Sequence, residues 1–233
     1  MTLAIMQPYL FPYIGYFQLL HACDCFVSLN DANFIKRGWI NRNRILLDGR
    51  DHLFTVPLRN VSQHASIQDT LIAPDDGWKR KLIQQMQHAY RKAPLAASVL
   101  PMVTDLIAGA EGSIADFAEA SLRATLQIIG IDRPFLRAST LQLRNDLRGQ
   151  DRIVAICEQL GARTYVNPPG GRDLYQVERF NERGLDLRFL KVQAGPYNQG
   201  VTDFIPGLSI IDVLMWNQPE QVRGLVEQYT LDA

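Results

Sequence analysis

The sequence predicts an α/β fold: a Rossmann-like, doubly wound and mainly parallel sheet with a mid-chain helical insertion at about residues 78–130. Three patterns lead to this fold class. Residues 1–31 read as strand, turn, helix and strand, which is a βαβ opening. Helical patterns fill residues 78–129, and strand–helix alternation resumes from residue 135. No repeat, low-complexity segment or linker divides the chain, so we expect residues 1–233 to form a single α/β domain.

The opening unit is expected to begin with a buried, central strand over residues 3–6, an apolar run that a Gln-Pro pair ends. Pro12 suits the entrance of a helix over residues 13–23, where apolar residues recur at helical spacing. A second apolar strand over residues 25–29 completes the unit.

Turn and capping residues place the other elements. Asp48-Gly49 predicts the turn of a hairpin, and Ser113 is a good N-cap for the last helix of the insertion. Glycines are expected to end several helices, because glycine adopts the left-handed conformation that closes a helix. Helices are expected over residues 78–89, 95–107, 113–129, 151–160, 172–183, 209–216 and 219–229, and strands over residues 135–138, 163–167 and 185–192.

Composition excludes several classes of protein. Lys+Arg and Asp+Glu both number 24, so nothing global indicates an extensive nucleic-acid or membrane-surface binder. The three cysteines are an odd number, and Cys23 and Cys25 lie too close for an ordinary disulfide, which favours a reducing compartment. Without Cys or His partners this pair is poor evidence for zinc, and no metal is expected. A signal-peptide pattern and a long apolar run are both missing, so we expect a cytoplasmic protein without a transmembrane segment.

The loop after the first strand is the first candidate site, because parallel open sheets bind ligands beyond the carboxyl ends of their strands. Its two prolines fix the loop shape, and the following helix directs its positive end toward a ligand. A glycine one turn into the helix allows backbone or ligand to approach closely. Packing of the aromatic side chains in core and rim is the alternative. The candidate substrate-binding residues here are Gln7, Tyr9, Tyr13, Gly15 and Tyr16.

Residues 13–16 read Tyr-Ile-Gly-Tyr. The layout resembles the nucleotidyltransferases that carry a His-Ile-Gly-His motif after a similar proline-containing loop. In those enzymes the histidines hold phosphate oxygens, whereas tyrosine carries no positive charge. The resemblance covers only the opening unit. It implies a pocket of similar geometry and leaves adenylyl transfer to a carboxylate as an alternative activity.

Residues 36–44 form a dense cluster of hydrogen-bond donors, with four cations among nine residues and an interleaved tryptophan. Arginine offers bidentate geometry to phosphate or carboxylate, and lysine a point charge. Read as a strand, the segment places Arg42 and Arg44 on one face and Trp39 on the other. Such a cluster at the carboxyl edge suits a small anionic substrate, such as a sugar nucleotide, an acyl phosphate or an activated amino acid. The candidate residues are Lys36, Arg37, Trp39, Asn41, Arg42 and Arg44.

Two alternatives remain open for this basic segment. Charge runs are usually solvated faces of a protein. A tRNA acceptor end is a second alternative, bound through phosphate contacts and stacking. The neutral overall charge disfavours extensive nucleic-acid binding.

Two later stretches also carry candidate residues. Residues 165–175 read as strand, glycine-rich turn and helix, and the turn amides are placed to cradle an anion; a plain turn is the alternative. Residues 208–217 hold a serine that suits an N-cap, and this structural role stands beside a catalytic one. The candidate residues are Asn167, Gly170, Gly171, Tyr175, Ser209 and Asp212.

Two side chains are the candidates for catalytic proton transfer. Asp31 closes the second strand at the expected site edge, with a turn-forming role as the alternative. His64 lies in a polar loop that can reach a site. The sequence has no Gly-x-Ser-x-Gly elbow, no His-Glu-x-x-His and no P-loop.

Four segments together resemble the WbqC-like proteins of bacterial surface-polysaccharide gene clusters. They are residues 7–15, 34–44, 165–175 and 208–217, in the family's order. The resemblance implies an acyl or aminoacyl transferase, with glycine as one candidate group, that acts on a sugar in O-antigen biosynthesis. It brings no assigned catalytic residues. No cofactor is certain, and a nucleotide or an activated acyl donor is the candidate. A non-catalytic module that binds a sugar nucleotide is a further alternative, and the sequence leaves the oligomeric state open.

Overall fold

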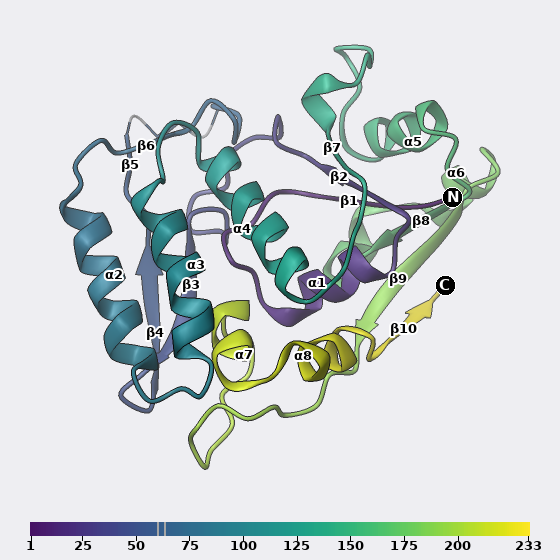
Figure 1. The fold of residues 1–233 in the computed structure, drawn as a ribbon. Coiled ribbons are helices and arrows are strands. Elements are labelled where there is room, and N and C mark those ends of the chain that lie inside the picture. The colour runs from purple at the N-terminus through teal and green to yellow at the C-terminus, as the bar shows by residue number, and fades with distance from the viewer. Residues whose placement is uncertain (60, 63) are drawn as a thin grey trace.

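The computed structural model describes residues 1–59, 61–62 and 64–233. Within them, a central sheet has six strands in the order β10-β9-β8-β1-β2-β7 (Figure 1). All neighbouring pairs are parallel except β9 and β10, which are antiparallel. The strands are β1 (Thr2–Met6), β2 (Cys25–Ser28), β7 (Phe135–Arg137), β8 (Thr164–Asn167), β9 (Asp186–Val192) and β10 (Tyr229–Asp232). The chain is therefore an α/β protein with a mainly parallel sheet, consistent with a Rossmann-like fold.

Helices pack on the sheet and bury its apolar strands. Alternate residues of β1 enter different hydrophobic clusters, because successive side chains of a strand point to opposite faces. Ala4 joins one cluster with residues of α1, α4, α7 and α8, whereas Leu3 and Ile5 join the other with residues of α5 and α6. The helices are α1 (Ile14–His21), α4 (Ile114–Ile128), α5 (Gly149–Gln159), α6 (Val177–Asn181), α7 (Ile210–Trp216) and α8 (Pro219–Val226).

The strand order of the central sheet reverses at β1. The chain passes from β1 to β2 on one side and later returns to β8 on the other side. Loops that leave neighbouring strands in opposite directions open the space where α/β proteins bind ligands. The loops after β1 and β8 diverge at this reversal, so the carboxyl edge of the sheet is the first place to search for a site.

A second group of elements covers one end of the molecule. Helices α2 (Gly77–Tyr90) and α3 (Ala96–Ala108) lie beside the hairpin of β3 (Arg42–Leu47) and β4 (Arg50–Thr55), as Figure 1 shows. The predicted hairpin turn is confirmed: Asp48 and Gly49 have φ of 49° and 75°, the left-handed values that a tight two-residue turn needs. A short pair, β5 (Leu58–Arg59) and β6 (Leu71–Ile72), adds a further sheet.

Two predicted helices differ from the structure. Residues 172–183 do not form one helix; a 3₁₀ helix, η2 (Pro169–Leu174), is followed by the short α6. The chain is extended at Tyr175, whose ring packs against Tyr165 and Phe180 with centroids 5.7 and 5.6 Å away. The last helix stops at Val226 and not at residue 229, because the following residues pair with β9 as the unpredicted strand β10. Another 3₁₀ helix, η1 (Ala138–Thr140), follows β7.

Candidate functional site

A cavity of about 580 Å³ lies at the carboxyl ends of β1, β2 and β7; we name it the carboxyl-edge cavity. Its volume suits a small-molecule site. Three loops and the start of α5 contribute polar side chains to its lining: Gln7, Asp31, Ser139, Arg144, Arg148 and Arg152. All six of these side chains are polar or charged, so they favour a polar ligand.

Asp31 forms an ion pair with Arg152 inside this cavity. The Oδ2 atom lies 2.5 Å from Nη2 of Arg152, and the two side chains are 21% and 23% exposed. The other oxygen, Oδ1, is buried and has no hydrogen-bond partner among the described residues. The arginine thus fixes one carboxylate oxygen, while the other keeps its hydrogen-bonding capacity unused within the described part of the chain.

A buried asparagine holds the loop that carries Asp31. Asn30 donates through Nδ2 to Oε1 of Gln68 (2.7 Å) and to Oγ of Ser139 (2.8 Å), and its Oδ1 accepts the amide of Ser139 (3.2 Å). Because Ser139 follows β7, this asparagine connects the loops after two neighbouring strands. The loops after β2 and β7, which both line the cavity, are therefore held together by one side chain.

The loop after β1 is held by a strained residue. Phe11 has φ of 41°, which is unusual for a non-glycine residue and costs free energy. Its amide donates to Oγ of Ser121 (3.0 Å), and its carbonyl accepts from Nδ2 of Asn43 (2.7 Å) and Oγ of Ser209 (2.8 Å). Side chains of α4 and β3 and the residue that caps α7 thus converge on the backbone of this one residue. Ser209 also caps α7 through the amide of Ile211 (3.2 Å), so its observed role is structural.

A second, smaller cavity brings the opening loop and the basic segment together. We name it the aromatic cavity; it has about 230 Å³ and is lined by Tyr9, Pro12, Tyr13, Trp39, Asn43, Arg44 and Gly207. Tyr13 and Trp39 are 39% and 40% exposed, so their rings are accessible to a ligand. Segments that lie thirty positions apart in the chain therefore form one recess.

Trp39 lies on the same side as two arginines, which differs from the predicted strand pattern. The guanidinium carbons of Arg42 and Arg44 are 5.7 and 5.8 Å from its ring centroid, within the range of a cation–π contact. The alternation fails because β3 begins only at Arg42. The residues before it form turns, so their side chains do not follow the period of a strand.

The other cations of the basic segment lie outside both cavities. Lys36 and Arg37 are exposed and line neither cavity. Arg42 donates to the carbonyls of Arg37 and Gly38, and so closes its own turn. Asn41 donates to the carbonyl of Val56 (2.8 Å).

Arg44 is the cation of this segment that lines the aromatic cavity. It pairs with Asp51 at 3.2 Å and donates to the carbonyl of Gly207 at 3.3 Å. Its Nε atom is buried without a partner in the part of the chain that the structure describes.

The aromatic residues of the opening loop have different roles. Tyr16 is buried and donates to the carbonyl of Gln7 (2.7 Å); burial is the main cause that raises its pKa, so it stays a neutral donor. The Tyr9 hydroxyl donates to Oε1 of the Gln7 side chain at 3.5 Å. The Tyr13 ring covers Gly15, where an added Cβ would lie 2.4–2.6 Å from ring atoms. This glycine thus accommodates a tyrosine ring of the same loop.

The glycine-rich turn after β8 packs within itself. The amide of Gly171 donates to the carbonyl of Pro168 (3.0 Å), and a Cβ there would lie 1.8 Å from Nδ2 of Asn167. Tyr165 donates to Oδ1 of Asn167 (3.0 Å) and contacts the hydroxyl of Tyr175 (3.2 Å). Gly170 is exposed. These residues line neither cavity, and the Gly171 amide is already used.

Asp212 is fully buried in α7, away from the lining of both cavities. It accepts hydrogen bonds from the hydroxyls of Tyr90 (3.3 Å) and Tyr197 (3.2 Å). Burial raises the pKa of Asp212 to about 7, although both tyrosine hydrogen bonds act in the opposite direction. The carboxyl group therefore links three segments of the core.

His64 is exposed in the loop between β5 and β6 and lines neither cavity. Backbone hydrogen bonds nevertheless join the loop that carries His64 to the segment directly after Asp31. The amide of Phe34 donates to Ala65, and that of Ile67 to Ala32, both at 2.9 Å. The structure thus brings the segments of the two proton-transfer candidates side by side.

Sequence reasoning missed the arginines of the carboxyl-edge cavity. Arg144 and Arg148 lie between the strand predicted at 135–138 and the helix predicted at 151–160, and Arg152 follows four residues later inside that helix. The signal that could have indicated them is this run of basic residues, which follows a predicted parallel strand. It also missed Asn30 and Ser139, whose contact depends on the tertiary fold.

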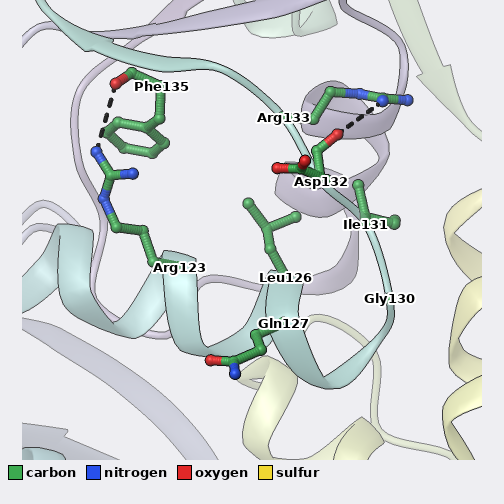
Figure 2. A pocket seen from close by; sticks show the side chains of 8 residues that line it. All are labelled: Arg123, Leu126, Gln127, Gly130, Ile131, Asp132, Arg133 and Phe135. Carbon is green, nitrogen blue, oxygen red and sulfur yellow. Dashed lines mark hydrogen bonds between the residues drawn. The ribbon is translucent and has the colours of Figure 1, made fainter.

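Another cavity, of about 480 Å³, lies at the opposite end of β7 (Figure 2). Its arginines are occupied by the protein: Arg123 lies 4.2 Å from the Phe135 ring centroid and donates to that residue's carbonyl at 3.4 Å. Arg133 donates to the carbonyl of His21 at 3.3 Å. These contacts are consistent with packing around the start of β7.

The described residues offer few groups suited to metal binding or to thiol chemistry. No group of three or more His, Cys, Asp or Glu in that part of the chain is placed to hold a metal ion. The three cysteines are buried and free. Burial raises the pKa of Cys23 and Cys157 to about 12, so both remain thiols at neutral pH.

Fold and site define an α/β protein with a parallel sheet, a polar cavity at its carboxyl edge and an aromatic recess beside it. The model of the WbqC-like protein family matches residues 7–224, and the chain belongs to this family. It is 26% identical over 214 residues, covering 91% of each chain, to "Uncharacterized protein Rv1507c" of Mycobacterium tuberculosis (strain ATCC 25618 / H37Rv). No solved structure matches the chain. Among the helices of the described residues, none has the length and apolar character to cross a membrane.

Proposed function

We propose that the protein transfers a small acyl or aminoacyl group, with glycyl as the specific candidate, onto a sugar during bacterial surface-polysaccharide (O-antigen) synthesis. Family membership and the sequence resemblance to proteins of polysaccharide gene clusters support the biological setting. One observation carries the proposal: the loop after β1 and the segment 35–44 contribute residues to both a polar and an aromatic cavity. Two adjoining recesses suit an enzyme that brings two substrates together.

The aromatic cavity is proposed to bind the acceptor sugar. The accessible rings of Tyr13 and Trp39 offer apolar surface to the carbon face of a sugar ring, and Arg44 offers polar contacts at the rim. The carboxyl-edge cavity takes the activated acyl donor. Gln7 lines that cavity and touches Tyr9 of the other, which places it between the two substrates.

Asp31 is proposed to act as the general base. The hydroxyl or amine of the sugar attacks the carbonyl carbon of the donor, and a new ester or amide bond forms. The bond to the activating group breaks, and that group leaves with the electron pair. The acceptor's proton passes to Oδ1 of Asp31, the oxygen that has no partner among the described residues, while Arg152 holds Oδ2. His64, on the neighbouring loop, is the second candidate for the proton.

We further propose that residues 1–233 form one doubly wound domain with a helical insertion at about 78–130, and that it acts in the cytoplasm. The two hydrophobic clusters on the sheet and the three helices between β6 and β7 support the first part. The three free, buried cysteines agree with a reducing compartment.

The test is product formation from a supplied donor. Purified protein is incubated with glycyl phosphate or a glycyl thioester and a nucleotide-linked amino sugar, and the product is followed by mass spectrometry. Asp31→Asn is expected to lower the rate by about 10²-fold or more, the usual contribution of a general base. The exposed Asp173 provides the matched control, since Asp173→Asn removes a carboxylate that does not line the cavity. If Asp31→Asn keeps full transfer activity and His64→Ala loses it, His64 is the general base.

Two other activities give different results in the same assay. A nucleotidyltransferase-like enzyme would release pyrophosphate only when ATP and the free amino acid are both present. The covering of Gly15 by Tyr13 does not favour this activity. A non-catalytic binding module would bind the sugar nucleotide without turnover, and its binding would be insensitive to Asp31→Asn and His64→Ala.

A further inference from the structure

The wall of the carboxyl-edge cavity that faces Gln7 and Asp31 comes from residues 143–152. We infer that Arg144, Arg148 and Arg152 on this wall form a subsite for a phosphoryl group, as found in a phosphate ester or phosphoanhydride. This deepens the proposed function and rests on it, because the phosphoryl group would be the activating or carrier group of the donor. Binding at the subsite is nevertheless measurable without turnover.

The charge of the cavity supports an anionic ligand. Three arginines line it, against Asp31 as the lining carboxylate, which pairs with Arg152. Arg144 is paired with Asp146 through atoms 3.1 and 2.5 Å apart, but both side chains are mostly exposed. Exposed pairs of this kind contribute little and are easily exchanged for another anion.

Arg148 is the most available of the three. Its Nη1 donates to the carbonyls of Asn145 (2.6 Å) and Leu147 (2.8 Å), and no carboxylate pairs with it within the described residues. These contacts use one nitrogen of the guanidinium group. The carbonyls therefore orient the side chain while other donors remain for a ligand.

The start of α5 adds a favourable potential to the arginine cluster. Arg148 is the N-cap residue, and its side chain makes no capping hydrogen bond in the part of the chain described. Gly149, the first residue of the helix, lines the cavity with φ of 50°. The unbonded amides of a helix start attract negative charge, and here they act together with three guanidinium groups.

The number of donors favours a phosphoryl group over a carboxylate. Three guanidinium groups present more N–H donors than the two oxygens of a carboxylate can accept, whereas phosphate and pyrophosphate offer more oxygens. A formal net charge of zero does not favour a long nucleic acid.

The experiment is isothermal titration of the full chain at low salt with inorganic phosphate, pyrophosphate and ADP. We expect pyrophosphate and ADP to bind, and Arg148→Gln to raise their Kd at least tenfold. The double variant Lys36→Gln/Arg37→Gln is the matched control, because it removes two exposed cations outside both cavities. It should change the Kd by less than twofold.

Three results would overturn the inference. They are unchanged affinity in both Arg148→Gln and Arg144→Gln, loss of affinity in the control variant alone, and equally strong binding of acetate or succinate. Thermal unfolding of each variant without ligand separates lost binding from lost folding. Acyl transfer that pyrophosphate does not inhibit would reject the subsite and leave the proposed function intact. If Arg148→Gln abolishes pyrophosphate binding but no transfer activity is found, the subsite is supported and the proposed function is rejected.

Discussion

At the scale of single residues, two carboxyl groups of this protein meet opposite environments. Asp31 lies in a cavity against Arg152, with one oxygen held. Asp212 lies in the core between two tyrosine hydroxyls, and in the described residues no cation pairs with it. Desolvation disfavours the charged form of a buried acid, and this burial raises the pKa of Asp212.

Asp212 predicts a pH dependence of stability. Its pKa is about 7 in the folded chain, against an ordinary value of 3.8. Between these values the folded state keeps a proton that the unfolded state has released. The contribution of Asp212 to stability is therefore full below about pH 4 and falls as pH rises to about 7, by at most roughly 1.4 kcal/mol per pH unit.

The measurement is urea unfolding at several pH values between 5 and 8. Asp212→Asn keeps the size of the side chain and removes the titration, so its free energy of unfolding should change less with pH than that of the wild type. Equal pH dependence of the two proteins would contradict this account. Asp31→Asn, measured in parallel, shows the effect of removing a different carboxylate.

At the scale of elements, predictions that depend on local signals agree with the structure, whereas one that ignores tertiary contacts does not. The Asp48-Gly49 turn and the Ser113 and Ser209 caps are confirmed, because turn and cap geometry depend on neighbouring residues alone. The break at Tyr175 is different. Its helical pattern is overridden by packing against Tyr165, which no local pattern contains.

The turn after β8 gives a matched pair of glycine variants. A Cβ at Gly171 would overlap the Asn167 amide, whose oxygen accepts from Tyr165, whereas one at Gly170 meets open space. Gly171→Ala is expected to lower the free energy of unfolding by about 1–3 kcal/mol, and Gly170→Ala to leave it nearly unchanged. Chemical denaturation measures both. Similar stabilities of the two variants would show that the turn relaxes freely.

At the scale of the whole molecule, the sheet and the meeting of two distant segments were accessible from sequence. Alternating elements predict a parallel sheet, and its carboxyl edge directs attention to the loops after β1 and β2. The positions of the cations relative to the cavities could not be predicted from the sequence. Lys36 and Arg37 point to solvent, while Arg148 lines the cavity from beyond β7, and this depends on how residues 138–149 return to the sheet.

Asn43 connects parts of the molecule that are distant in the chain. It is buried, donates to the carbonyls of Leu10 (3.0 Å) and Phe11 (2.7 Å), and lines the aromatic cavity. Asn43→Ala leaves two carbonyls with fewer donors and should cost about 1–3 kcal/mol of stability. Under conditions where the variant is folded, acceptor binding should also weaken. Asn33→Ala, at an exposed residue lining the other cavity, is the control and should keep wild-type stability.

The strained peptide at Phe11 has a consequence for recognition. Hydrogen bonds from three side chains in separate parts of the fold fix the shape of the loop. Substrates would then meet a pre-organised surface and would not have to supply the free energy of ordering it. Selectivity among sugars would follow from rigid shape complementarity, acquired when the chain folds, and closely related sugars would be told apart by fit instead of by loop closure.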